Sequence, residues 1–425
     1  MSCVELYQHQ EAALKSAEGK NKVAFYHDMG LGKTFTGAEK LIQLGGRVNL
    51  LICQKSKIDD WIEHFNTYYN ISVYNLSKKK AFQDFILNAS KNAMSVAIIN
   101  YDLVFRRREL RAIEFDTMML DESSLIQNEN SKRSKFILHL LRFKNVILLS
   151  GTPTHGKYEN LWSQLRLLGW NISKDLFWQQ YVDFEWQDKN GFPMKIVKGY
   201  KNVERLKKKL REYGAQFLKT EEVLNLPEQI EQFIKVKTTS EYRKFKKDAI
   251  VEIDSQTLIG DTILTKMLYE RQLCGHYNQD KLEAFKNIVE STEDRLIVFY
   301  NFNAELSALK DIAIEYERPI SYVNGSGRSM QAYEDCSNSI TFVQYQAGSF
   351  GLNLQKANKI VYFTLPLGKG SCATWEQSKK RIHRIGQNQP CFYYYLLCKN
   401  SIEERNLELL KLGKELTDNL FMEDL

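Results

Sequence analysis

"HDMGLGKTFTGAEKLI" (residues 27–42) follows the apolar run "KVAFYH" (22–27) and opens a segment with helical spacing. An apolar strand that ends in a glycine-rich loop and continues as a helix is the phosphate-binding unit of parallel α/β proteins. Glycines let backbone N–H groups approach phosphate oxygens, the lysine carries a cation to the β and γ phosphates, and the threonine offers a hydroxyl to magnesium. The first glycine of the general GxxxxGK[ST] pattern is absent, because His27 stands there. The predicted nucleotide loop comprises Met29, Gly30, Leu31, Gly32, Lys33 and Thr34.

Short apolar runs recur along the chain, separated by segments with helical spacing. Nearly continuous apolar strands that alternate with helices are typical of parallel sheets covered on both faces. The pattern occurs twice, so we expect two α/β domains in tandem. The expected strands are 22–27, 49–54, 95–100, 117–121 and 145–151 in the first half, and 295–301, 320–325, 340–345, 359–364 and 391–397 in the second.

The region between these two sets of strands, residues 157–290, is rich in charge and has little strand signal. We therefore expect a helical insertion in each domain, at about 157–215 and about 240–290. Pro227, in "NLPEQ", cannot continue a helix and restricts the residue before it. The predicted domains are residues 1–225 and 226–425.

The composition is that of a large globular protein with a mild basic excess. The 425 residues are 43% hydrophobic and carry a net charge of +7. Basic clusters such as "RLKKKLR" (205–211) are usually solvated helix faces, yet several of them together favour a polyanion partner. Seven cysteines without a CxxC pair or zinc-ligand spacing indicate reduced core thiols in a cytosolic compartment. No apolar run is long enough for a membrane segment, and we expect no secretory signal.

A pair of acidic residues, Asp121 and Glu122, ends the apolar run "TMML" (117–120). The carboxyl end of a strand in an open parallel sheet lies at the ligand crevice. We assign Asp121 to hold a hydrated Mg²⁺ ion and Glu122 to orient and deprotonate the attacking water. The alternative is that the pair caps the next helix, since acidic residues favour a helix N-terminus. The later run "NVILLSGT" (145–152) brings small hydroxyl residues to the same edge.

These segments, in their order, resemble the motifs of superfamily 2 helicases, and specifically of the Swi/Snf-type DNA translocase branch. "DMGLGKT" is similar to motif I, "LDES" to motif II, and "LLSGTP" with "NLWSQLRLLG" to the motif III region. "LYQHQEAAL" resembles the glutamine motif, "ICQKSKIDDWIEHF" motif Ia and "IINYDLV" motif Ib. "LIVFYNFNAEL" resembles motif IV, "VQYQAGSFGLNLQKANKIVYF" motif V and "EQSKKRIHRIGQNQP" motif VI. "FLKTEEVLNLPEQ" and "ERQLCGHY" are also similar to this branch, and the ordered set spans residues 6 to about 405.

The resemblance implies two RecA-like domains that bind ATP and Mg²⁺ between them, with Thr34 and Asp121 as the magnesium ligands. It further implies nucleotide contacts from Gln10, to the adenine, and from Gly351 and Asn353. Nucleic-acid contacts are implied for Lys55, Ser56, Asn100, Tyr101, Thr152, Asn301, Ala347, Gly348 and Ser349. Contacts of this kind reach sugar and phosphate, so binding should be independent of base sequence and sensitive to salt.

Arg381 and Arg384 stand three residues apart in the motif VI segment. In a helix they would lie on one face, about a turn apart, and such a segment is often only a solvated basic face. The resemblance instead implies that both are arginine fingers, which the second domain directs at the γ-phosphate. Hydrolysis would then require the domains to close, and chemical state would become relative motion. His383, between the two arginines, is expected to pack or relay rather than to catalyse.

Some positions depart from the family pattern. "YHD" (26–28) stands where a small residue and two acids are common, and Ser124 stands at a motif II position that is often histidine. These departures put in doubt how motif II communicates with motifs III and VI. His276 beside Cys274 admits a metal site, although we expect helical packing there. The short insertions, without a recognisable histone-reading module, favour a compact bacterial or phage-like member over a nucleosome remodeller.

The predicted function is that of a DNA-dependent ATPase that translocates along duplex DNA. A strand-separating DNA helicase is the alternative within the same class. A nucleotide-gated scaffold that recruits replication or nuclease proteins is the alternative from another class, and the intact set of Lys33, Glu122 and Arg384 argues against it. We expect replication, recombination or nuclease proteins as partners, no membrane association, and a place in the cytoplasm of a bacterium or of a phage-infected host.

Overall fold

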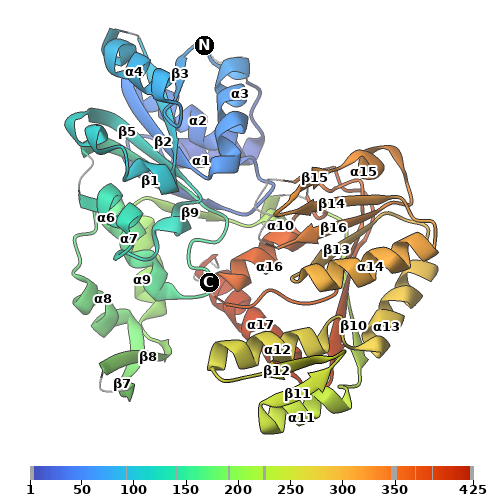
Figure 1. Ribbon diagram of the computed structural model, residues 1–425. Helices are drawn as coiled ribbons and strands as arrows, with labels where there is room; N and C mark the ends of the chain where they lie inside the picture. The colour runs from blue at the N-terminus through green and yellow to red at the C-terminus, as the bar shows by residue number, and fades with distance from the viewer. Residues whose placement is uncertain are drawn as a thin grey trace. The chain divides into compact units, whose positions relative to one another are not determined.

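The computed structural model describes residues 4–91, 93–139, 142–189, 192–223, 226–345, 352–368, 370–384 and 386–421. The chain divides into two compact units (Figure 1). The first comprises residues up to 224 together with the end of the chain from Glu415, and the second comprises residues 225–414. The division lies beside the boundary drawn from Pro227, whereas the sequence analysis had left the last residues with the second domain.

A seven-stranded sheet runs through the described part of the first unit, in the order β3-β4-β2-β5-β6-β1-β9. All its neighbouring strands are parallel. The strands are β1 (Lys22–His27), β2 (Val48–Cys53), β3 (Ser72–Asn75), β4 (Ser95–Asn100), β5 (Glu114–Asp121), β6 (Arg142–Leu149) and β9 (Ala215–Leu218). Because parallel strands end at one edge of the sheet, the loops that follow β1, β5 and β6 meet at that edge.

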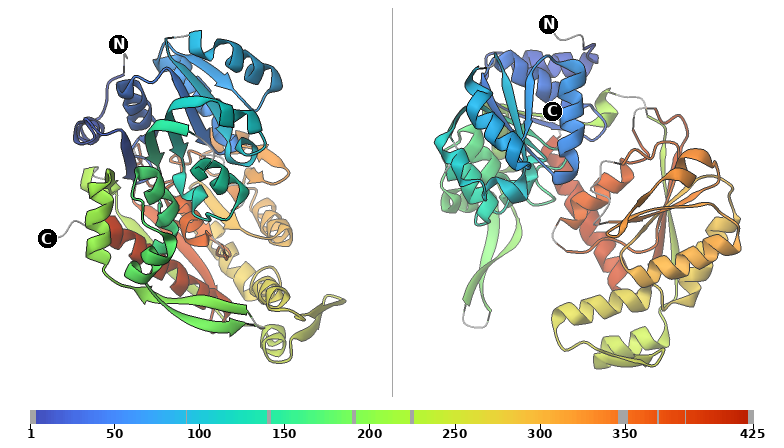
Figure 2. Two further views of the ribbon diagram at one scale, coloured as in Figure 1. Left: turned by 90° about the vertical axis from the view of Figure 1, so that its left-hand side faces the viewer. Right: turned by 45° about the horizontal axis from the view of Figure 1, so that its top comes forward.

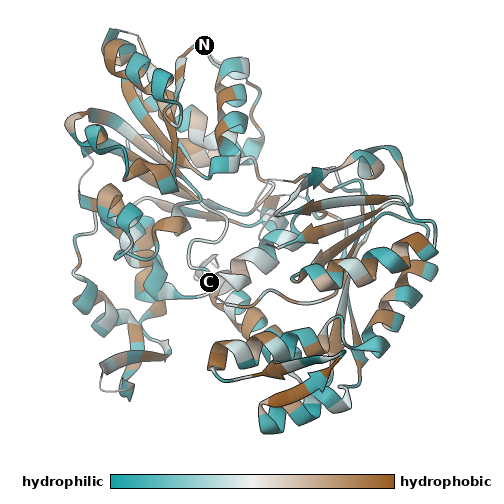
Figure 3. Cartoon of the chain, viewed as in Figure 1, coloured by the Kyte–Doolittle hydropathy of each residue, from teal (hydrophilic) through white to brown (hydrophobic). Residues whose placement is uncertain are grey.

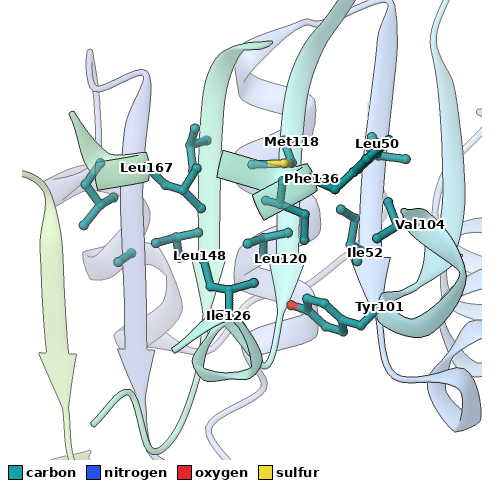
Figure 4. Close-up of a cluster of buried hydrophobic side chains, with 14 of the residues drawn as sticks. Leu50, Ile52, Tyr101, Val104, Met118, Leu120, Ile126, Phe136, Leu148 and Leu167 are labelled. Carbon is teal, nitrogen blue, oxygen red and sulfur yellow. The ribbon is translucent and has the colours of Figure 1, made fainter. Parts of the chain in front are cut away.

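Alternate residues of these strands enter two separate cores. Val23 and Phe25 of β1 face α1 (Gln8–Ser16), α2 (Lys33–Leu44) and α3 (Ile58–Tyr68). Ala24 and Tyr26 belong to the core on the other face, part of which is drawn in Figure 4. The helices of that face are α4 (Lys79–Asn88), α5 (Tyr101–Val104), α6 (Lys132–His139), α7 (Trp162–Leu168), α8 (Lys174–Tyr181) and α9 (Val203–Glu212). Single turns of 3₁₀ helix are η1 (Lys55–Lys57), η2 (Ala89–Lys91), η3 (Arg108–Ala112), η4 (Ser123–Ile126) and η5 (Tyr158–Leu161), and α10 is Thr220–Val223.

The second unit is also built on a seven-stranded sheet within the described residues, in the order β10-β18-β17-β13-β16-β14-β15. Its pairs are parallel except β14–β15. The strands are β10 (Gln229–Val236), β13 (Leu296–Tyr300), β14 (Ile320–Asn324), β15 (Gly327–Ser329), β16 (Ile340–Gln344), β17 (Lys359–Tyr362) and β18 (Cys391–Cys398). The helices are α11 (Ser240–Asp248), α12 (Ile263–Cys274), α13 (Gln279–Glu290), α14 (Asn303–Glu315), α15 (Gln331–Asp335), α16 (Ser371–Lys379) and α17 (Ile402–Phe421).

Both faces of the second sheet are covered as well. Residues of α13 and α14 share one core with β13 and β16, and residues of α16 and α17 share the other core with β17 and β18. Figure 3 shows the central strands as hydrophobic and the covering helices as mixed. The ten predicted strands are all present, with ends displaced by a few residues, and the predicted class of two α/β units with parallel sheets is confirmed.

Both predicted insertions contain helices, and each also contains a two-stranded hairpin that was not predicted. The first contains the antiparallel hairpin β7 (Val182–Lys189) and β8 (Phe192–Tyr200), drawn as a two-stranded ribbon in Figure 2. The second contains the hairpin β11 (Ile250–Ile253) and β12 (Gln256–Ile259). The sheet strands β3, β9, β10 and β15 were not predicted either.

Side-chain pairing explains why the charged first hairpin is stable as strands. Trp186 and Lys195 are cross-strand partners, and Lys195 Nζ lies 4.8–5.3 Å from the ring centroids of Trp178, Phe184 and Trp186. Cross-strand and cation–π contacts of this kind stabilise a hairpin. Val182, Phe184 and Trp186 alternate with polar residues, a strand signal that the sequence analysis did not use.

The cysteines agree with the prediction of reduced thiols. Of the seven, six lie in the described residues, where all are free and all but Cys336 are buried. Among the described helices, none combines the length and the apolarity that a bilayer crossing requires.

Candidate functional site

The loop between β1 and α2 has the backbone of a phosphate cradle. Gly30 and Gly32 have φ angles of 90° and 70°, in the left-handed region that glycine adopts without strain. Because α2 begins at Lys33, the free N–H groups and positive dipole end of this helix lie at the loop. A methyl group on Gly32 would come within 2.3 Å of Gln10 Nε2, so the loop is closed against a side chain there.

The lysine of the loop is held by main-chain carbonyl groups. Lys33 Nζ donates to the carbonyl oxygens of His27 at 2.8 Å and Asp28 at 3.0 Å. Burial, together with the charges of Lys33 and His9, lowers the pKa of His27 to about 3. His27 is therefore neutral at physiological pH, and Lys33 supplies the cation at this end of the sheet.

The side chain of Gln10 hydrogen-bonds to the backbone of the phosphate loop. Its side chain is 2% exposed, and Nε2 donates to the carbonyl oxygens of Leu31 at 3.3 Å and Gly32 at 3.2 Å. Its Oε1 accepts a hydrogen bond from the backbone N–H of Tyr7. The carboxamide is thus committed to the loop, and the adenine contact implied for Gln10 stays a prediction.

Thr220, late in the chain of the first unit, also hydrogen-bonds to the phosphate-loop segment. Asp28 Oδ2 accepts hydrogen bonds from the Oγ1 of Thr220, at 3.1 Å, and from its backbone N–H, at 3.3 Å. Thr220 is buried and begins α10, in the segment that leads to the second unit. The phosphate loop and this connecting segment are therefore fastened to each other.

Asp121 lies at the carboxyl end of β5, as predicted. Its Oδ2 accepts a hydrogen bond from Trp61 Nε1 at 2.9 Å, and the backbone N–H of Glu122 also donates to the carboxylate. Burial raises the pKa of Asp121, while the Trp61 hydrogen bond and the charges of Lys33 and Lys57 oppose the rise. A carboxylate within electrostatic reach of the loop lysine, together with the Thr34 hydroxyl, makes an all-oxygen donor set, which suits Mg²⁺.

Glu122 occupies a strained backbone position. Its φ and ψ are 54° and 56°, a conformation that is uncommon for a residue with a side chain. The hydroxyl of the buried Tyr101 donates to the carbonyl oxygens of Asp121, at 2.9 Å, and of Glu122, at 3.4 Å. Glu122 directly precedes η4, yet its side chain makes no capping hydrogen bond. Glu122 therefore stands at the N-cap position without a capping hydrogen bond from its side chain.

One buried carboxamide connects this segment with two others. Gln164 Oε1 accepts hydrogen bonds from Ser123 Oγ at 2.7 Å and Tyr26 OH at 3.0 Å. Its Nε2 donates to the carbonyl oxygen of Pro153 at 2.8 Å. Gln164 thereby joins β1, the end of β5 and the loop after β6, which correspond to the segments likened to motifs I, II and III.

The loop after β6 also lies against the phosphate loop. A methyl group on Gly151 would be 3.2 Å from Met29 Cγ and 3.4 Å from Lys33 Nζ. The neighbouring Thr152 is 6% exposed, and its buried Oγ1 has no hydrogen-bond partner. Three loops thus converge on Lys33, and one unsatisfied hydroxyl lies among them.

The residues predicted to bind nucleic acid have unlike surroundings. Lys55 is exposed, Ser56 is half-buried, and Asn100 and Tyr101 are buried with the Tyr101 hydroxyl committed as described above. In the second unit, Asn301 Nδ2 donates to Thr364 Oγ1 at 2.8 Å and to the Leu365 carbonyl at 3.1 Å. Ala347, Gly348, Ser349 and Gly351 lie outside the described residues.

The two arginines of the second unit do not lie on a helix face. α16 ends at Lys379, and Arg381 and Arg384 lie in the turn that follows. Arg381 Nη1 donates to the carbonyl oxygen of Leu352 at 3.3 Å. Arg384 is half-buried, its buried Nε has no hydrogen-bond partner, and burial lowers its pKa.

The residues around the two arginines fit the predictions in part. His383 Nε2 lies 2.9 Å from the carbonyl oxygen of Pro227, and the side chain is 3% exposed, in keeping with the predicted packing role. Asn353, predicted to contact the nucleotide, is exposed.

Cys274 lies in a compact buried group with Cys398 and Glu403, whose ligand atoms are within 4.8 Å of one another. Each of these groups already has protein partners. Glu403 pairs with the buried Lys281 through Oε1 and accepts from the backbone N–H of Cys398 through Oε2. The Cys398 thiol interacts with the carbonyl oxygen of Cys274. These hydrogen bonds engage the Glu403 carboxylate and the Cys398 thiol within the fold, and His276 is not part of the cluster.

Sequence reasoning did not single out Trp61, Gln164 or Thr220. Each stands inside a stretch that was likened to a motif, namely "IDDWIEHF", "NLWSQLRLLG" and "FLKTEE". Each meets its partner 60, 41 and 192 residues away in the chain, respectively. The sequence shows that these residues carry an indole N–H, a carboxamide and a hydroxyl. It does not show which distant residues they bond.

Comparison with known proteins places the chain in a family. The SNF2-related domain matches residues 7–279. The ISWI chromatin-remodeling complex ATPase ISW1 of Saccharomyces cerevisiae is 25% identical over 92% of this chain and 38% of its own length. The putative ATP-dependent helicase/translocase YwqA of Bacillus subtilis is 23% identical over 93% of this chain and 46% of its own. This chain therefore spans less than half the length of these curated relatives.

Among solved structures, the Sulfolobus solfataricus SWI2/SNF2 ATPase core in complex with dsDNA aligns with a TM-score of 0.45 and 20% identity. The alignment covers 98% of this chain and 93% of that chain. The family match extends over most of the chain, from the segment before the phosphate loop to the beginning of α13. The chain belongs to the SNF2-related domain family.

Proposed function

We propose that this chain is a DNA-dependent ATPase that hydrolyses ATP between its two units and translocates along duplex DNA. One observation carries the proposal: three loops converge at the carboxyl edge of the first sheet, and buried hydrogen bonds fix each of them. These loops bring together the phosphate cradle, the acidic pair and the segment at Gly151. Membership of the SNF2-related family supports the same conclusion.

The proposed roles follow from the chemistry of the side chains. Lys33 binds the β and γ phosphates, and Glu122 orients and deprotonates the attacking water. Thr34 and Asp121 would hold Mg²⁺, which neutralises phosphate charge when bound. Arg381 and Arg384 of the second unit stabilise the charge that develops on the transferred phosphoryl group.

We assign ATP binding to residues 1–225 and the second helicase domain to residues 226–425, with Gln10, Gly351 and Asn353 as further nucleotide contacts. DNA would bind through Lys55, Ser56, Asn100, Tyr101, Thr152, Asn301 and residues 347–349. Because the Tyr101 side chain is buried, a contact at that position would use the backbone. The proposed partners are replication, recombination or nuclease proteins. The proposed location is the cytoplasm of a bacterium or of a phage-infected host.

Steady-state ATPase assays without nucleic acid and with single-stranded DNA, duplex DNA or RNA test the proposal. We expect stimulation by DNA, by duplex at least as strongly as by single strands, and a near-complete loss of turnover in Lys33→Ala and Glu122→Gln. Slow turnover that no nucleic acid changes would favour the scaffold alternative. Displacement of a third strand from triplex DNA, without separation of the duplex, distinguishes translocation from strand separation.

A further inference from the structure

Trp61 lies in the first turn of α3 and is 2% exposed. Its ring stacks on Phe65, with centroids 5.6 Å apart, and meets His64 edge-on. Packing accounts for the ring. It does not account for the direction of the indole N–H, which points at Asp121 Oδ2 from 2.9 Å.

Other indoles of this chain show that packing alone does not require such a bond. The buried Nε1 atom of Trp178 has no hydrogen-bond partner, and Trp162 Nε1 donates to the main-chain carbonyl of Ile172. An indole N–H is a donor only, so it favours a carboxylate that is ionised and held in one orientation. Among the described indole N–H groups with a recorded partner, that of Trp61 is directed at a carboxylate.

Asp121 itself has limited freedom. Oδ2 is taken by Trp61, the backbone N–H of Glu122 also binds the carboxylate, and the Tyr101 hydroxyl fixes the main-chain carbonyl of Asp121. Groups that orient a metal-binding carboxylate from behind typically change metal affinity by about 10–100-fold when they are removed. A residue in this position acts on the metal through the ligand and touches neither metal nor nucleotide.

We propose that Trp61 is a positioning residue that orients the Asp121 carboxylate for Mg²⁺. The inference rests on the proposed function, because Asp121 is a metal ligand only if the chain binds Mg²⁺ with nucleotide. It adds that the affinity for the metal depends on α3, an element outside the phosphate loop and the acidic pair.

The test measures metal binding without turnover. Mn²⁺ binding in the presence of a non-hydrolysable ATP analogue is followed by electron paramagnetic resonance in the full chain. Trp61→Phe keeps an aromatic ring but loses the N–H, and benzothienylalanine at position 61 keeps the bicyclic shape while losing the N–H. Trp162→Phe is the matched control, since it also removes a bonded indole N–H, but one whose acceptor is the main-chain carbonyl of Ile172 rather than Asp121.

We expect both changes at position 61 to weaken Mn²⁺ binding about tenfold. Binding of the analogue in EDTA should be unchanged, and Trp162→Phe should bind Mn²⁺ like the wild type. In the ATPase assay the Mg²⁺ concentration for half-maximal rate should rise by the same factor, with kcat recovered at saturating Mg²⁺. A merely structural role would instead lower kcat and analogue affinity at every Mg²⁺ concentration.

Unchanged Mn²⁺ affinity in Trp61→Phe would overturn the inference, as would normal affinity in the benzothienylalanine protein, because the N–H would then not be responsible. Both results would leave the proposed function intact. If the wild type binds the analogue but no Mn²⁺ with it, the magnesium site of the proposed function falls, and this inference falls with it.

Discussion

The two units carry sheets of the same size and kind, but they hold their candidate catalytic side chains differently. In the first unit, Lys33, Asp121 and the backbone of Glu122 are each fixed by hydrogen bonds from within that unit. In the second unit, Arg384 lies in a turn beyond the end of α16, and its buried Nε has no partner. A buried donor without a partner is costly, by about 1–3 kcal/mol.

Under the proposed function, the difference separates the groups that bind substrate from the group that acts on the transferred phosphoryl. Groups that bind and orient a substrate gain from being fixed in advance by their own domain. A group that stabilises charge on a substrate held by the other unit needs hydrogen-bond donors that are not already used within its own unit. The first unit has the features of a binding site, whereas the second carries Arg381, bonded to the Leu352 carbonyl, and Arg384, whose buried Nε is unsatisfied.

The largest effects should separate these two roles. Lys33→Ala should abolish both nucleotide binding and turnover. Arg384→Ala should retain nucleotide affinity and lose turnover by about 10³–10⁵-fold, or about 4–7 kcal/mol in the barrier. Nucleotide titrations by fluorescence and single-turnover hydrolysis measure the two properties separately.

Arg405→Ala, which removes an exposed arginine from α17, is the control for the loss of a positive charge in the second unit. Normal hydrolysis by Arg384→Ala, beside an inactive Lys33→Ala, would mean that the second unit supplies no such cation. The comparison of the two units would then lose its functional meaning.

Two glycines that flank α2 allow the contact between Gln10 and the phosphate loop to be tested. Gly32 precedes the helix and Gly45 ends it, both with left-handed φ, at 70° and 65°. Alanine costs about 1–2 kcal/mol of backbone strain at either position. Only at Gly32 does the methyl group meet a neighbour, Gln10 Nε2 at 2.3 Å, whereas none lies within 4 Å at Gly45.

Gly32→Ala should therefore cost about 1–3 kcal/mol more unfolding free energy than Gly45→Ala, the usual cost of overpacking. It should also weaken nucleotide binding, because Gln10 must leave the loop carbonyls. Urea unfolding and nucleotide titration of both variants give the comparison. Equal losses in the two variants would show that Gln10 yields freely and does not brace the loop.

The phosphate loop and both sheets were predictable because their signals are local. β1 is a continuous apolar run, Gly30 and Gly32 are needed for left-handed backbone, and α2 starts where the helical spacing starts. Each of these features depends on residues within a few positions of one another. The same holds for Asp121 at the end of β5.

The supports of the site were not predictable, because they depend on distant pairs. Gln164 joins Tyr26, Ser123 and Pro153 only after the sheet has brought three loops together. The first hairpin, by contrast, carries a local strand signal in the alternation of Val182, Phe184 and Trp186, and it was missed because the charged region around it was taken as helical. A shared helix face for Arg381 and Arg384 was expected only if their segment were helical, and α16 ends before them, at Lys379.

Acidification should weaken the first unit around α3. His64 packs among Phe35, Trp61 and Tyr68, and burial lowers its pKa to about 4. Between pH 6.5 and 4 the unfolded chain binds a proton that the folded chain excludes, so stability is complete above pH 6.5 and falls as the pH falls through this window. At pH 5 the loss from His64 is about 2 kcal/mol.

His64→Phe should remove that part of the pH dependence, and the lowered pKa of His27 leaves a remainder. Hydrogen exchange of α3 amides at pH 7.5 and pH 5, corrected for intrinsic rates, measures the local effect, with α14 of the second unit as the reference. A wild type and a His64→Phe variant with the same pH dependence in α3 would show that His64 is protonated in the folded chain.

The smallest expected effect concerns the contact between Asp28 and Thr220. Thr220→Val removes the Oγ1 hydrogen bond and keeps the backbone N–H bond to the same carboxylate. One hydrogen bond contributes about 1 kcal/mol, and Thr257→Val, at an exposed position of β12, controls for the change of side chain. A double-mutant cycle with Asp28→Asn isolates the pair, since coupling energy appears only if the two side chains act on each other.

If the coupling is zero, the loop and the segment leading to the second unit are neighbours without being fastened, and nucleotide binding has no route through this contact. A coupling near 1 kcal/mol means that a change at Asp28, such as one caused by nucleotide binding, alters the stability of the contact with Thr220 at the start of α10.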